Sequence, residues 1–103
     1  MIWKALTGGL ASKDADAFAK QLAAELVAQL GDASERGSRK FQARAGKALA
    51  QAERRISAFK TEHKLNWMQR SKCSNTFLWA LKDAGCPESY AQELTQWFVT
   101  QLG

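Results

Sequence analysis

Residues 38–60 read SRKFQARAGKALAQAERRISAFK and carry the clearest amphipathic pattern in the chain. At about 100° per residue, apolar side chains gather on one face of a helix. They are Phe41, Ala45, Ala48, Leu49, Ala52, Ile56 and Phe59. Basic side chains gather on the opposite face. They are Arg36, Lys40, Arg44, Lys47 and Arg54. The stretch therefore predicts a long helix with an Ala-rich packing face and a basic outer face.

A second long helix is expected over residues 13–30, before this stretch. Ser12 is of the residue type that caps helix N-termini, and Gly31 is of the type that ends helices. Ala and Leu recur at helical spacing between them, which predicts a face that packs closely against a neighbour. Residues 1–11 contain two adjacent glycines and are expected to form a flexible or docking N-terminal arm.

Two shorter helices are expected in the C-terminal third of the chain. One covers residues 76–84, with Ser74 or Asn75 as its N-cap, and the other covers residues 87–102, with the only proline in its first turn. Residues 61–75 are less periodic and predict a short helix followed by a turn. The expected fold class is therefore all-α, a compact bundle of four or five helices with short connections.

The length and composition indicate one folded domain over residues 1–103. A chain of 103 residues could not fill a second core, and 46% hydrophobic residues with 24% charged residues are typical of globular proteins. No stretch approaches the ~20 apolar residues of a transmembrane helix, and the N-terminal residues lack a secretory signal. Cys73 and Cys86 are too sparse for a disulfide framework. We expect thiols and a cytoplasmic protein.

Positive charge is concentrated in the middle third. Residues 36–72 hold eleven Lys or Arg against two acids, whereas residues 1–35 and 73–103 each carry a balance of −2. Such a block suits phosphate binding, because each cation that neutralises a phosphate releases condensed counterions. Trp67 lies inside the block and could stack on an unpaired base. The candidate nucleic-acid-binding residues are Arg36, Arg39, Lys40, Arg44, Lys47, Arg54, Arg55, Lys64, Trp67, Arg70 and Lys72.

The same charge pattern has other interpretations. A surface helix must show polar residues to water, and Lys and Arg are good helix formers there. An acidic protein partner would be attracted by the same field, and an anionic membrane surface less so, because the apolar face of residues 38–60 has few large side chains. The alternative function is a protein-interaction or assembly subunit, self-association included, that uses exposed Trp or Leu on residues 76–84 or the N-terminal arm.

No residue pattern points to catalysis, to a metal site or to a cofactor. His63 is the only histidine, and with Cys73 and Cys86 it lacks the paired spacing of zinc ligands. Residues 76–102 resemble a helix-turn-helix only in outline, because the second helix has Glu88 and Glu93 and no cation to meet phosphates. The sequence therefore favours a non-catalytic, nucleic-acid-associated protein.

Overall fold

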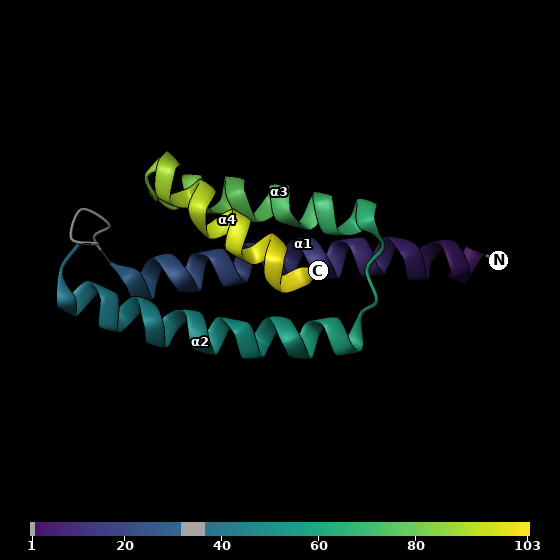
Figure 1. The fold of residues 1–103 in the computed structure, drawn as a ribbon. Helices are drawn as coiled ribbons and strands as arrows, with labels where there is room; N and C mark the ends of the chain where they lie inside the picture. The colour runs from purple at the N-terminus through teal and green to yellow at the C-terminus, as the bar shows by residue number, and fades with distance from the viewer. Residues whose placement is uncertain (1, 32–36) are drawn as a thin grey trace.

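The computed structural model describes residues 2–31 and 37–103, with the side chains of residues 13–31 and 37–103 (Figure 1). Four α-helices follow one another along the chain. They are α1 (Ile2–Leu30), α2 (Arg39–Glu62), α3 (Trp67–Asp83) and α4 (Glu88–Leu102). No strand occurs in these two described ranges. The expected all-α class is thus confirmed, with four helices in the described part of the chain.

The helices pack as a ring in which α1 contacts α2 and α3, and α4 contacts α2 and α3. The connection from α2 to α3 therefore crosses the bundle, from the lower helix to the upper one in Figure 1. α1 is the longest helix, with 29 residues, and its N-terminal part extends beyond the ends of α2 and α3 (Figure 1). The molecule is accordingly elongated, with extents of 53 × 23 × 19 Å.

The core has a small-residue half and an aromatic half. It includes five buried alanines, at positions 15, 19 and 23 of α1 and at positions 48 and 52 of α2. Small side chains let two helices approach closely along their lengths. Between α3 and α4, the rings of Phe77 and Phe98 stack with their centroids 4.2 Å apart. Phe18 and Phe59 stack in the same way at 4.4 Å and join α1 to α2.

The predicted start of the first helix is wrong. α1 begins at Ile2 and not at Lys13, so Ser12 lies inside the helix and is not its N-cap. The glycines at positions 8 and 9 lower helix propensity locally, but they do not end the helix. The predicted end is confirmed, because Gly31 follows Leu30 with a φ of +70°, a conformation that strains other residues.

The predicted start of the third helix is also wrong. Residues 67–83 form one continuous helix, and the turn expected near residue 75 is absent from it. Its N-cap is Asn66, whose side chain accepts a hydrogen bond from the Gln69 N–H at 2.8 Å. The Gln69 side chain in turn accepts from the Asn66 N–H at 2.9 Å. This reciprocal capping box satisfies two N–H groups and fixes the start of α3.

The end of α3 agrees with the sequence. Gly85 has a φ of +95° and donates its N–H to the Lys82 oxygen, while the Cys86 N–H reaches the Leu81 oxygen, both at 3.0 Å. These two bonds form a Schellman motif, which reverses the chain directly into α4. Pro87 occupies the N-cap position of α4, where its missing N–H costs no hydrogen bond.

Candidate nucleic-acid interface

Four cations lie exposed along the outer face of α2, opposite the core. They are Arg39, Lys40, Lys47 and Arg54. Lys40, Lys47 and Arg54 follow one another at intervals of seven residues, which is about 10.5 Å of helix rise with a drift of only ~20° per step. These three side chains therefore start from an almost straight row about 21 Å long.

Several positions between these cations carry very short side chains. Ala43, Gly46 and Ala50 are all exposed on α2, and none of them has a side chain longer than a methyl group. Glu53 is the only acid between Arg39 and Thr61, and at 100° from Arg54 on the helix it points to one side of the row. A large polyanion can therefore approach Lys40, Lys47 and Arg54 over short side chains, with the exposed Glu53 beside the row.

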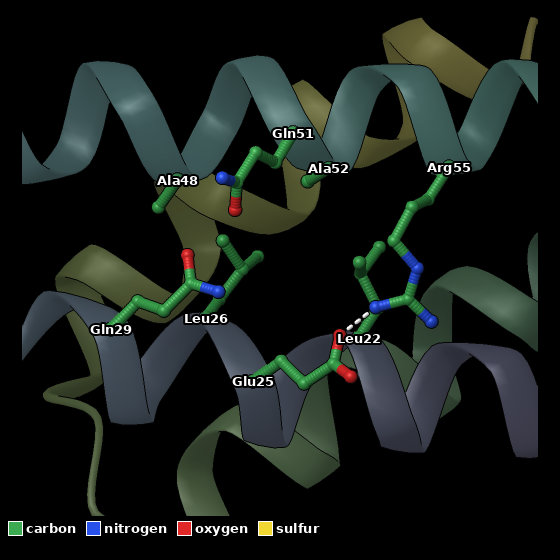
Figure 2. A pocket seen from close by; sticks show the side chains of 8 residues that line it. All are labelled: Leu22, Glu25, Leu26, Gln29, Ala48, Gln51, Ala52 and Arg55. Carbon is green, nitrogen blue, oxygen red and sulfur yellow. Dashed lines mark ion pairs between the residues drawn. The ribbon is translucent and has the colours of Figure 1, made fainter.

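Two of the predicted nucleic-acid-binding residues on α2, Arg44 and Arg55, face α1 instead. Arg44 donates from Nη2 to the Leu30 oxygen at 3.1 Å, and its guanidinium lies 5.6 Å from the centroid of the Phe41 ring. Arg55 forms an ion pair with Glu25, which Figure 2 shows across the gap between the two helices. These contacts tie α2 to α1, so the two arginines have structural partners that the outer cations lack among the described residues.

A groove of about 310 Å³ lies between α1 and α2 (Figure 2). Leu22, Leu26, Ala48 and Ala52 form its apolar floor, and Glu25, Gln29, Gln51 and Arg55 form its polar rim. The charges on this rim are those of the Glu25–Arg55 pair, which balance each other. The groove therefore offers no net attraction to a phosphate.

A second group of cations lies where the α2–α3 connection meets the end of α4. Lys60, His63, Lys64 and Arg70 line a hollow of about 220 Å³ there, which we call the basic pocket. Lys60 donates to the main-chain oxygens of Gln101 and Gly103 at 2.9 and 3.0 Å and so fastens α2 to α4. Arg70 is half-buried in this hollow, whereas Lys64 is exposed.

The tryptophans differ in their surroundings. Trp67, at the start of α3, is 69% exposed, and its neighbour Met68 is 62% exposed. Trp79 is 54% exposed, and Lys82 lies over its ring with Nζ 4.5 Å from the centroid. Trp97 is half-buried. Trp67, the tryptophan among the predicted binding residues, is thus exposed.

The structure separates the predicted site residues into three groups. Arg39, Lys40, Lys47 and Arg54 share the outer face of α2, and Arg44 and Arg55 face α1. Lys64, Trp67, Arg70 and Lys72 lie around the start of α3. Arg36 is outside the described residues.

Lys60 and His63 of the basic pocket were not among the predicted residues. Their neighbours there come from α3 and from the end of α4, and the residues that accept from Lys60 are 41 and 43 positions away. Local sequence spacing carries no signal for such contacts. His63 also packs its ring against that of Phe59, with the ring centroids 4.6 Å apart.

The buried thiol of Cys73 is not suited to nucleophilic chemistry. Its Sγ donates to the Ala15 oxygen at 3.3 Å, and burial, helped by the charge of Asp16, raises the pKa of the thiol to about 12. A thiol with such a pKa is almost entirely protonated at neutral pH. In the described part of the chain, no three His, Cys, Asp or Glu side chains come together in a way that could hold a metal ion.

Comparison with protein-family models, with curated proteins and with solved structures finds no match to this chain. The described helices also include none that is long and apolar enough to cross a membrane. A functional assignment therefore depends on the surface of the molecule itself.

Proposed function

We propose that this chain is a non-catalytic protein that binds nucleic acid through the phosphate backbone, with little base specificity. The observation that supports it is the four exposed cations on the outer face of α2, the row of Lys40, Lys47 and Arg54 with Arg39 beside it. Each phosphate that such a cation neutralises releases counterions, and this term dominates non-specific binding. We also propose a cytoplasmic location, since two cysteines in 103 residues suit a reducing compartment.

The spacing of the row explains why specificity should be low. A duplex carries one charge per ~1.7 Å of axis, so a length of 21 Å holds about twelve phosphates, spread around its two strands. Four cations can therefore find phosphates in many registers. The short side chains of Ala43, Gly46 and Ala50 between them carry no donor or acceptor that could read a base edge.

A salt titration tests this proposal. With four phosphate contacts, log K for a 20-base-pair duplex should fall with log salt at a slope of about −3.6, which is a ~150-fold loss of affinity between 50 and 200 mM. Fluorescence anisotropy of a labelled duplex measures it. Absence of binding at ~50 mM salt, where such contacts are strongest, would contradict the proposal.

A second candidate function rests on the outer face of α3. Met68 and Trp79 are both exposed and, eleven residues apart, lie almost on one line of the helix. Trp79 also lines a groove of about 500 Å³ that Lys20 of α1 borders. Under this candidate two copies of the chain associate through Trp79. Sedimentation equilibrium should then show a mass that rises with concentration and returns to the monomer value in Trp79→Ser, whereas a monomer at all concentrations would exclude it.

A further inference from the structure

We infer that the nucleic acid this chain prefers is single-stranded, with an unpaired base stacked on Trp67 and a neighbouring phosphate in the basic pocket. This inference rests on the proposed function. Trp67 is more exposed than any other large hydrophobic side chain that the structure describes. Among the described residues, no aromatic ring and no cation lies over the indole of Trp67, whereas Lys82 lies over the indole of Trp79.

The cations around Trp67 predict a negatively charged ligand. Lys64 and Arg70 precede and follow it by three residues and both line the basic pocket. On a helix, side chains three residues apart have Cβ atoms about 5–6 Å from each other, so the Arg70 guanidinium and the Trp67 indole start from neighbouring positions. One ligand can therefore meet an aromatic face and cations at the same time. A nucleotide has both the phosphate and the flat base that this pairing accepts.

The aromatic face also decides between single and double strands. In a duplex the bases are stacked on each other, and only the terminal pair could meet an indole. Proteins that bind single strands use exposed aromatic rings beside a basic groove, because every unpaired base has a face to stack. The row on α2 can serve either form, since it needs only phosphates. Trp67 adds a stacking contact that only unpaired bases can make. An acidic protein has no base to stack on the Trp67 indole.

The test compares Trp67→Leu with Trp79→Leu, which removes an exposed indole from the same helix outside the basic pocket. Affinities for a labelled 20-nucleotide thymidine strand and for a 20-base-pair duplex are measured at one salt concentration. Loss of one stacked base should weaken strand binding by Trp67→Leu about 5- to 150-fold and leave duplex binding within about twofold. Trp79→Leu should bind both as the wild type does. Trp67→Phe, which keeps a ring, should recover most of the loss. Far-ultraviolet circular dichroism checks that the variants are folded.

The possible results separate the inference from the proposed function. If the wild type binds neither nucleic acid at ~50 mM salt, the proposed function fails and the inference fails with it. If the wild type binds both, but Trp67→Leu binds the strand as tightly as Trp79→Leu does, only the inference is overturned. Equal competition by polyglutamate and by unlabelled thymidine strand would also overturn it, because polyglutamate offers charge without bases.

Discussion

Arg44 of α2 donates a hydrogen bond to the main-chain oxygen of Leu30, the last residue of α1, at 3.1 Å. The carbonyl oxygens in the last turn of a helix lack partners within the helix, and the negative end of the helix dipole attracts a cation there. One cation of the predicted basic face of α2 therefore caps the preceding helix, so the positive block of residues 36–72 has a structural part as well as an exposed part.

Replacement of Arg44 by Met should lower the free energy of unfolding by about 1–2 kcal/mol, through the lost charged hydrogen bond and the lost contact with the Phe41 ring. Lys47→Met is the matched control, because Lys47 is exposed on the same helix. Its stability should stay within about 0.5 kcal/mol of the wild type. Urea unfolding followed by circular dichroism measures both, and equal stabilities for the two variants would contradict a structural role for Arg44.

The capping box predicts that the same substitution has different effects on stability at Asn66, the N-cap of α3, and at Asn75, in the middle of α3. Asn66→Ala should lower stability by about 1 kcal/mol, because the N–H groups at the start of α3 lose their partner. Asn75→Ala, which changes an exposed residue in the middle of the helix, should leave stability unchanged or raise it slightly, since Ala has the higher helix propensity. Thermal unfolding compares them. A larger loss for Asn75→Ala would mean that α3 begins near residue 75 after all.

These two asparagines also show where sequence reasoning reached its limit. Local signals placed the end of α1 at Gly31 and the end of α3 near residue 84 correctly, because chain reversal at a helix end depends on a few adjacent residues. The signal for the start of α3 was equally local, because Asn66 is followed three residues later by Gln69. The mostly polar residues 69–76 nevertheless lack the apolar periodicity that predicts a helix. Tertiary packing explains that run, since Cys73 and Ser74 are buried in α3.

The candidate site was predictable only in part. The exposed row on α2 follows from helical periodicity, which is why Lys40, Lys47 and Arg54 were found together. Periodicity could not indicate that Arg44 and Arg55 turn towards α1, because their partners lie 14 and 30 residues earlier in the chain. It also could not bring Lys60 to the end of α4, a contact that depends on how the four helices pack.

The aromatic half of the core should dominate stability. Phe98 is fully buried and stacks on Phe77 with an interplanar angle of 15°. Phe98→Ala leaves a cavity and should cost about 3–5 kcal/mol, whereas Phe98→Leu keeps most of the volume and should cost less. Guanidinium unfolding measures both. A cost below about 1 kcal/mol for the Ala variant would show that this ring is not part of the core.

Stability should fall at high pH because of Cys73. Burial raises the pKa of its thiol from 9.0 to about 12, so the fold favours the protonated form. Its contribution is fully present below about pH 9 and is lost towards pH 12, since the unfolded chain releases the proton first. Between pH 9 and 11 the free energy of unfolding should fall more steeply for the wild type than for Cys73→Ala, by up to ~1.4 kcal/mol per pH unit. Parallel curves for wild type and Cys73→Ala would contradict the assignment.

The most direct test of the central claim compares the salt dependence of duplex binding for two double variants of equal charge. Lys47→Gln with Arg54→Gln removes two cations from the outer face of α2, and Lys13→Gln with Lys20→Gln removes two exposed cations from α1. If the row on α2 contacts phosphates, the first variant should flatten the slope of log K against log salt by about 1.8, and the second should leave it unchanged. Equal flattening by both variants would mean that only net charge matters, and it would contradict a binding face on α2.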